Sequence, residues 1–261
     1  MVWITTIYLA YLFAPMLLLL IGSFGSIWFG TLIPGGFTTH WYIDVVNDPS
    51  FRRAFWVSLQ VAGATCLLNA LVGLPFAYAI YGAASRGVRA AARVLYLLPI
   101  AVPPLVLAFG FILAFSTDVL PFLGSLWILI GGHVVLTLPY MLQTLVGDMR
   151  HLRLAELETA AESLGGSLIS RLMDIVVPSL RHSLAAGMIV VAALSIGEFQ
   201  LSNLVAGFLT RPYPVVLLQA FYGATGFACA ATVILLVLAL GASLTGALTA
   251  TAAQAARGIP A

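Results

Sequence analysis

Glu198 is the side chain with the clearest chemical potential, because it lies well inside a long apolar stretch and no other carboxylate does so. A charge at the centre of a bilayer costs about 2.5–3.5 kcal/mol on insertion scales, so such a residue usually faces a polar cavity or a partner. One interpretation is an electronegative point on a pathway for a cation, with Gln200 and Asn203 nearby. The other is a glutamate that bonds a neighbouring helix, in which case Glu198→Leu lowers stability and Glu198→Gln is nearly silent. On either interpretation we expect Glu198→Gln to leave folding intact.

Other chemistry is excluded by what the sequence lacks. All eleven cationic side chains are arginine, so a lysine-dependent phosphate-binding loop and Schiff-base catalysis are both absent. Cys66 and Cys229 lie in apolar runs and read as small hydrophobes, with no disulfide framework and no metal-ligand spacing. The sequence therefore predicts no catalytic residue, no metal site and no enzyme activity.

The solvent of this chain is lipid. Of 261 residues 62% are hydrophobic and 8% are charged, against about 25% charged in soluble domains. About 20 apolar residues cross a bilayer as a helix. We expect an all-α polytopic fold, a single transmembrane domain over 1–261, with six transmembrane helices. They are predicted at 4–29, 55–81, 94–115, 126–146, 184–204 and 227–250.

The distribution of arginine predicts the orientation of the chain in the membrane. Eight arginines fall after the second, fourth and sixth spans, and three fall in the opposite connections. By the positive-inside rule, both termini then face the cytoplasm. Inside the predicted spans, Gln60 and Asn69 read as bonds between helices. His133 reads as a satisfied packing residue.

A polar insert at 148–182 separates the fourth and fifth spans. It has an apolar helical face, and Thr159, Glu162 and Ser163 lie opposite with Glu158 near the boundary. The face consists of Leu154, Leu157, Ala161, Leu164 and Leu168. Gly165 and Gly166 predict a left-handed cap, and Pro178 suits the first turn of the next helix. A helix lying on the membrane surface is an alternative, but an acidic polar face suits a protein groove better.

The insert resembles the signature loop of the membrane subunits of binding-protein-dependent ABC importers. That pattern is Glu-Ala-Ala, three residues, Gly, nine residues, then Ile-x-Leu-Pro. The matching positions are Ala160, Ala161, Gly165, Ile175 and Pro178. Thr159 stands at the glutamate position, although Glu158 precedes it, and Val177 replaces the leucine.

The resemblance implies a coupling helix that docks on a cytoplasmic ATPase. Its residues would be Glu158, Thr159, Ala160, Ala161, Gly165, Ile175 and Pro178. Two ATPase subunits would hold ATP and Mg, so this chain would carry no cofactor and would not hydrolyse ATP. A second, non-identical permease subunit and a periplasmic or lipid-anchored substrate-binding protein would complete the importer. The resemblance also implies a bacterial inner membrane as the location. No nucleic acid is expected.

Two further segments resemble the second permease of spermidine/putrescine importers: 36–42 and 195–207. The resemblance favours a polyamine substrate. Relatives that import 2-aminoethylphosphonate, ferric iron or thiamine remain alternatives, and a stand-alone secondary transporter or channel is a remote one. Segments 98–104 and 138–140 also look like this family, and their prolines predict kinks. The expected pathway residues are Glu198, Gln200, Asn203, Pro103, Pro104 and Tyr140.

Overall fold

The computed structural model describes residues 2–28, 31, 33–117 and 119–237. Within these residues the regular structure is helical, apart from two isolated β-bridges at Ile27–Gly35 and Gly124–Ala206. The all-α prediction is therefore confirmed. Contacts group the chain into two compact units, Met1–Phe55 with Tyr213–Ala261, and Trp56–Pro212. The single domain over 1–261 stays a prediction.

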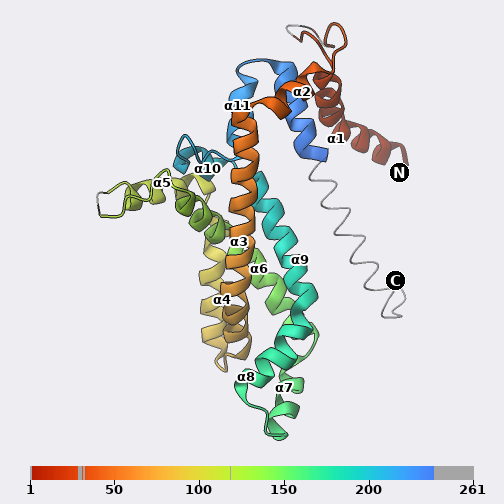
Figure 1. Cartoon of the computed structure of the whole chain (residues 1–261). Coiled ribbons are helices and arrows are strands. Elements are labelled where there is room, and N and C mark those ends of the chain that lie inside the picture. Colours follow the sequence, from red (N-terminus) through yellow and green to blue (C-terminus); the bar gives the residue numbers. More distant parts are fainter. Residues whose placement is uncertain (1, 29–30, 32, 118, 238–261) are drawn as a thin grey trace. The chain divides into compact units, whose positions relative to one another are not determined.

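Figure 1 labels the helices along the chain. The first five are α1 (Val2–Ser23), α2 (His40–Asn47), α3 (Pro49–Gly82), α4 (Arg86–Ala101) and α5 (Pro104–Phe115). The middle of the chain forms α6 (Leu126–His151), α7 (Leu154–Ser163), α8 (Leu168–Ser170) and a π-helical turn, η1 (Arg171–Val176). The last are α9 (Val177–Gly197), α10 (Gln200–Val205) and α11 (Tyr213–Phe221).

Within the described part of the chain, four helices are long and apolar enough to cross a membrane, and α4 with α5 supplies a fifth span if this bent pair counts as one. The predicted sixth span at 227–250 is described only in part. Its first residues belong to a shorter apolar helix, Thr225–Val237, and residues 238–261 lie outside the described part of the chain. A polytopic membrane fold is thus established, and the count of six stays a prediction.

Two predicted spans are broken, which corrects the expectation of continuous or merely kinked helices. The span at 94–115 bends by 96° between α4 and α5. Val102 is extended there, because a residue before proline is pushed out of the helical region and Pro103 has no N–H to continue the ladder. The span at 184–204 stops at Gly197, and Glu198 is extended before α10 begins. Pro139, in contrast, lies inside α6, which runs on through it.

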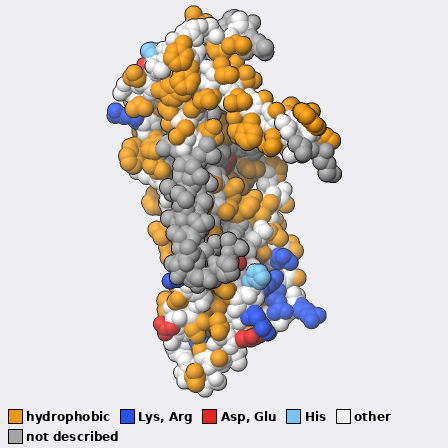
Figure 2. Space-filling view, turned by 90° about the vertical axis from the view of Figure 1, so that its right-hand side faces the viewer, with side chains coloured by type: hydrophobic (Ala, Val, Ile, Leu, Met, Phe, Trp, Pro, Cys, Tyr) orange, Lys and Arg blue, Asp and Glu red, His pale blue; other side chains and the backbone are white. Residues whose placement is uncertain are grey.

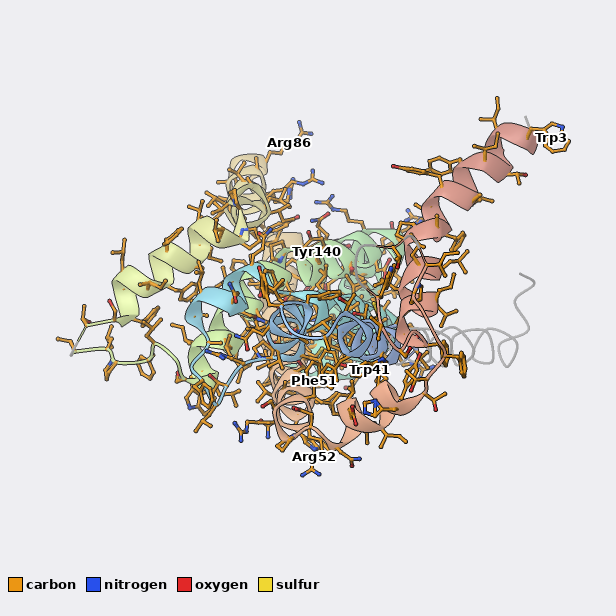
Figure 3. The ribbon with its side chains drawn as sticks, turned by 90° about the horizontal axis from the view of Figure 1, so that it is seen from above. Trp3, Trp41, Phe51, Arg52, Arg86 and Tyr140 are labelled. Atoms are coloured by element: carbon orange, nitrogen blue, oxygen red, sulfur yellow. The ribbon has the colours of Figure 1, made fainter. Side chains whose placement is uncertain are left out.

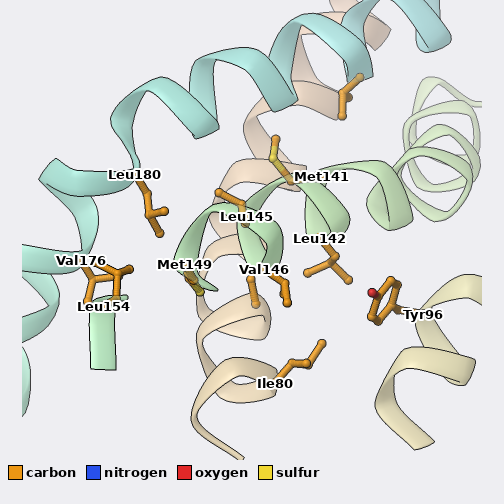
Figure 4. Packing of buried hydrophobic residues seen from close by; sticks show 12 residues of the cluster. Ile80, Tyr96, Met141, Leu142, Leu145, Val146, Met149, Leu154, Val176 and Leu180 are labelled. Carbon is orange, nitrogen blue, oxygen red and sulfur yellow. The ribbon is translucent and has the colours of Figure 1, made fainter. Parts of the chain in front are cut away.

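The core of the unit Trp56–Pro212 is built around α6. Met141, Leu142, Leu145 and Met149 of α6 are fully buried, and Figure 4 shows them between side chains of α3, α4 and α9. A Cβ at Gly187 of α9 would lie 2.6 Å from the Met141 sulfur. Small residues let membrane helices approach closely, so Gly187 sets the α6–α9 spacing.

The other unit is described by itself. Phe51 makes edge-on contacts with Tyr213 and Phe227, and the Tyr213 hydroxyl donates to the Ala231 carbonyl at 2.8 Å. The Trp41 indole donates to the Gly25 carbonyl at 2.8 Å and ties α2 to the end of α1. The side chains of α1 are exposed over most of its length, from Trp3 onward (Figure 3). Lipid or a partner chain is the expected cover for such an apolar helix.

Candidate functional site

A cavity of about 280 Å³ lies where the broken helices of the unit Trp56–Pro212 meet. Its walls come from the α4–α5 break, the middle of α6 and the end of α9. The lining residues are Pro99, Ile100, Val102, Pro104, His133, Leu136, Thr137, Tyr140, Leu194, Ser195 and Glu198. The helix breaks matter here because irregular backbone at membrane depth is tolerated where it lines a cavity or is buried in protein.

The Glu198 carboxylate caps the N-terminus of α10. Its Oε1 accepts from the Leu201 backbone N–H at 2.7 Å, and its Oε2 accepts from the Ser202 N–H at 2.9 Å and the Ser202 hydroxyl at 2.7 Å. A carboxylate at this position satisfies donors that no intrahelical carbonyl reaches, and it complements the helix dipole. These bonds explain why the span ends at Glu198 and a new helix starts two residues later.

His133 of α6 bonds to both helices that flank the break. Its Nδ1 lies 2.7 Å from the Ser195 hydroxyl of α9, and its Nε2 lies 2.9 Å from the Ser202 hydroxyl of α10. The same Nε2 lies 3.5 Å from Glu198 Oε2, with the His133 side chain 1% exposed and that of Glu198 10% exposed. The prediction of a satisfied packing histidine is confirmed, and the histidine also holds the break together.

Polar bonds continue along α6 toward α3. The Thr137 hydroxyl donates to the His133 carbonyl at 2.6 Å and accepts from the Asn69 amide at 2.9 Å. Asn69 therefore bonds α3 to α6, as predicted. The same prediction for Gln60 is wrong, because its side chain is exposed and has no hydrogen-bond partner among the residues that the structure describes.

Three of the six predicted pathway residues come together. Glu198, Pro104 and Tyr140 line the cavity, whereas Gln200, Asn203 and Pro103 are exposed and do not line it. Sequence reasoning missed the roles of Ser195 and Ser202. Their spacing carried a signal, because each lies within one helical turn of Glu198, but serine is too common in membrane helices for that spacing to be decisive.

The predicted insert forms a second site at the end of α6. The Tyr78 hydroxyl of α3 donates to Glu158 Oε1 at 2.6 Å, and the Tyr81 hydroxyl accepts from the Ala155 backbone N–H at 3.0 Å. Leu154 is buried in the same core cluster as Val176 of η1. One side of α7 is thus fixed to α3 and η1. The opposite side is a shallow open depression lined by Ala155, Glu156, Thr159, Ala160 and Ser163.

Gly165 ends α7 as the sequence predicted. Its φ is +85°, in the left-handed region, and its N–H donates to the Glu162 carbonyl at 2.9 Å. The Gly166 N–H donates to the Ala161 carbonyl, also at 2.9 Å, which completes a Schellman motif. Arg171 then pairs with Glu162 at 2.8 Å and ties η1 back to α7. Pro178 lies in the first turn of α9, also as predicted, and Ile175 is half-buried in η1.

The predicted apolar face of the insert is wrong in part. The helix ends at Ser163, so Leu164 and Leu168 lie beyond it, and they are 89% and 54% exposed. Only Leu154 of that set is fully buried. Glu158, expected to face a partner, turns inward to Tyr78, because a hydroxyl at hydrogen-bonding distance stabilises the half-buried carboxylate.

No protein-family model matches the chain. The spermidine/putrescine transport system permease protein PotC of Escherichia coli K12 is 30% identical over 205 residues, covering 78% of this chain and 75% of PotC. The putative 2-aminoethylphosphonate transport system permease protein PhnV of Salmonella typhimurium LT2 is 25% identical over 213 residues, covering 81% of this chain and 79% of PhnV.

Solved structures share the fold. A bacterial ABC transporter involved in the import of the acidic polysaccharide alginate superposes with a TM-score of 0.76 at 18% identity, covering 94% of this chain and 91% of that chain. The alginate ABC transporter in complex with an alginate pentasaccharide-bound periplasmic protein gives a TM-score of 0.72 at 17% identity, covering 94% and 90%.

An all-α polytopic fold with a cavity at two helix breaks is typical of a membrane transporter. The likeness to PotC over most of both chains gives the family: this chain belongs to the permease subunits of ABC importers. It is therefore a multi-pass inner-membrane transport subunit rather than an enzyme. The alternative of a stand-alone secondary transporter or channel is set aside.

Proposed function

We propose that this permease imports a polyamine of the spermidine/putrescine class, driven by two cytoplasmic ATPase subunits. A second, non-identical permease subunit forms the other half of the pathway, and a periplasmic or lipid-anchored binding protein delivers the substrate. ATP and Mg are held by the ATPase subunits. Both termini and α7 face the cytoplasm, which the arginine distribution supports.

The observation that carries the coupling role is that α7 is bonded to the rest of the chain on one side and open on the other. One side is bonded to the end of α3 through Tyr78 and Tyr81, so force on α7 reaches a membrane span directly. The other side presents the small residues Thr159 and Ala160 around an open depression, where a partner helix or groove can approach closely. Gly165, Ile175 and Pro178 shape the turn behind this surface, and Ala161 closes it through its carbonyl.

The cavity supports a cationic substrate. Glu198 places a carboxylate on its wall, and the ring of Tyr140 lines it as well. Carboxylates and aromatic faces both attract ammonium groups, and the attraction grows when water is excluded. The likeness to PotC points to the same substrate class. Gln200, Asn203 and Pro103 face away from this cavity in the single chain and belong to the pathway only if the second permease brings them into it.

The test is uptake by the purified complex in proteoliposomes with its own binding protein. Labelled spermidine or putrescine should enter in an ATP-dependent manner, and unlabelled polyamine in excess should abolish uptake. Labelled 2-aminoethylphosphonate is the second candidate substrate because of the likeness to PhnV. Labelled ferric iron and thiamine are tested in the same assay. Saturable uptake of one of these three with no polyamine uptake would refute the polyamine assignment and leave the importer role intact.

A further inference from the structure

An arginine-lined cavity lies apart from both sites described above. It has a volume of about 140 Å³ and lies between α3, α4 and α6 in the unit Trp56–Pro212. Its lining consists of Ile80, Arg89, Arg93, Tyr96, Gln143, Val146, Gly147 and Arg150. Three arginine side chains line this space, and no carboxylate of the described residues does. Figure 2 shows basic side chains gathered toward the lower end of one face.

Helical spacing brings these groups together. Arg89, Arg93 and Tyr96 follow at four and three residues along α4, so they share one face. Gln143, Val146 and Arg150 do the same on α6. Figure 4 shows Tyr96 directed from α4 toward α6. Ile80 of α3 and Val146 of α6 also line the cavity.

Most polar side chains that line this cavity have no hydrogen-bond partner among the described residues. Arg89 donates to the Ala83 carbonyl. The side chains of Arg93, Gln143 and Arg150 are exposed and have no hydrogen bond or ion pair with any of the residues that the structure describes. Like charges that line one cavity repel each other, so an anion bound between them would reduce this repulsion. Arginine forks fit phosphate oxygens in particular.

The size and position of the cavity indicate the source of the anion. Engineered cavities of about 150 Å³ admit a molecule as large as benzene, so a phosphate group fits in this one. Beyond Arg93, α4 exposes the apolar residues Val94, Leu95 and Leu98. A charged head beside an apolar wall at the end of membrane spans matches an amphiphile. Basic pockets between membrane helices on the cytoplasmic side are known to take anionic lipid headgroups.

We propose that this cavity binds the phosphate diester of an anionic phospholipid headgroup, with Arg93 and Arg150 as its main charge partners. The lipid then bridges α4 and α6, nearer the C-terminal end of α6 than the cavity that Glu198 lines. The proposal does not depend on which substrate is imported. It predicts a preference for anionic over zwitterionic lipids at one site per permease chain.

The probe is phosphatidylglycerol added to the delipidated, assembled complex in detergent, with bound lipid counted by native mass spectrometry. The double variant Arg93→Gln with Arg150→Gln should weaken binding of the lipid about thirtyfold. Each arginine near an anionic headgroup strengthens binding by about fivefold, and the double variant loses two of them. Gly147→Leu tests the space without touching charge, because a Cβ there meets nothing within 4 Å and the added side chain fills the cavity. It should remove the bound lipid with all three arginines in place.

Two matched variants act as controls. Arg86→Gln removes a charge from α4 outside the cavity; Arg86 is labelled in Figure 3 at the outer end of that helix. Gly131→Leu adds the same bulk to α6, again where a Cβ meets nothing within 4 Å. Both should retain the lipid. Equal loss in the controls, or undiminished binding in the double arginine and Gly147→Leu variants, would overturn the proposal.

Further arms separate the possible ligands. Phosphatidylcholine should not occupy the site, and millimolar inorganic phosphate should not displace phosphatidylglycerol. Displacement by inorganic phosphate would instead identify a free-phosphate site and reject the lipid. Loss of ATPase subunits from the complex in the double arginine variant would identify an acidic partner segment as the occupant, and would also reject the lipid. Uptake assays on the same preparations show independently whether the importer itself is intact.

Discussion

Replacing Glu198 by glutamine removes one acceptor from a cap that uses both carboxylate oxygens. The amide offers one oxygen, and its nitrogen is a donor. If the oxygen keeps the bonds to Ser202, the amide nitrogen faces the Leu201 N–H, which Glu198 Oε1 accepts at 2.7 Å in the wild type. The first turn of α10 is then left with an unsatisfied donor. The structure therefore predicts a local loss of stability, whereas the sequence alone led us to expect that Glu198→Gln leaves folding intact.

The size of the effect follows from that one donor. A buried donor without a partner costs about 1–3 kcal/mol, and loss of the negative charge at a helix N-terminus costs about 0.3–1 kcal/mol more. The gain from no longer burying a charge acts in the opposite direction. We expect the free energy of local opening of α10 to fall by about 2 kcal/mol, which corresponds to roughly thirtyfold faster amide exchange.

Hydrogen exchange of the assembled complex, read on peptides that contain Leu201 and Ser202, measures this directly. Gln200→Ala is the matched control, because Gln200 is exposed on the same helix and has no side-chain partner among the described residues. It should leave exchange unchanged. Unaltered protection in Glu198→Gln would refute the capping argument. If uptake were also lost in that variant, the carboxylate would act through its charge on the substrate alone.

The remaining predictions concern the coupling segment, the core and the orientation. Gly165→Val should abolish substrate-stimulated ATP hydrolysis because φ is +85°, whereas Gly165→Asn, which tolerates that conformation, should keep most of it; equal activities would contradict the role of the cap. Gly187→Val should lower the free energy of unfolding by about 1–3 kcal/mol through overpacking against Met141, and so lower the thermal midpoint of the complex. Gly187→Ala should give a midpoint between those of the wild type and the valine variant, and an unchanged midpoint in both variants would show that Gly187 does not set the α6–α9 spacing. A cysteine at Glu162 should react with an impermeant reagent only from the cytoplasmic side, and labelling of intact cells from outside would reverse the topology.

Composition and motif spacing predicted the features that depend on local sequence. The membrane class, the helices α3 and α6, the left-handed cap at Gly165 and the place of Pro178 in the first turn of α9 all follow from apolar run length or from one residue's backbone preference. These signals are local, so one sequence suffices to find them.

The features that were missed depend on partners far away in the chain. Proline at 103 and 104 indicated an interruption of the helix, but the size of the bend, 96°, also depends on how α5 packs against α10 and α6. The break at Glu198 is stabilised by a histidine 65 positions earlier, and the inward turn of Glu158 by a tyrosine 80 residues away. An apolar stretch of uniform composition gives no sign of where such partners lie.

The central claim is that α7 contacts an ATPase subunit through its open side, and cross-linking tests it most directly. A cysteine at Ala160, in the exposed depression, should form a cross-link to an ATPase chain that carries a phosphate-binding loop, and the yield should change when ATP is added. A cysteine at Val119, exposed in the connection that precedes α6 at its other end, should form none. Cross-linking from Val119 but not from Ala160, or no ATPase product from Ala160 in a complex that contains the ATPase, would contradict the account.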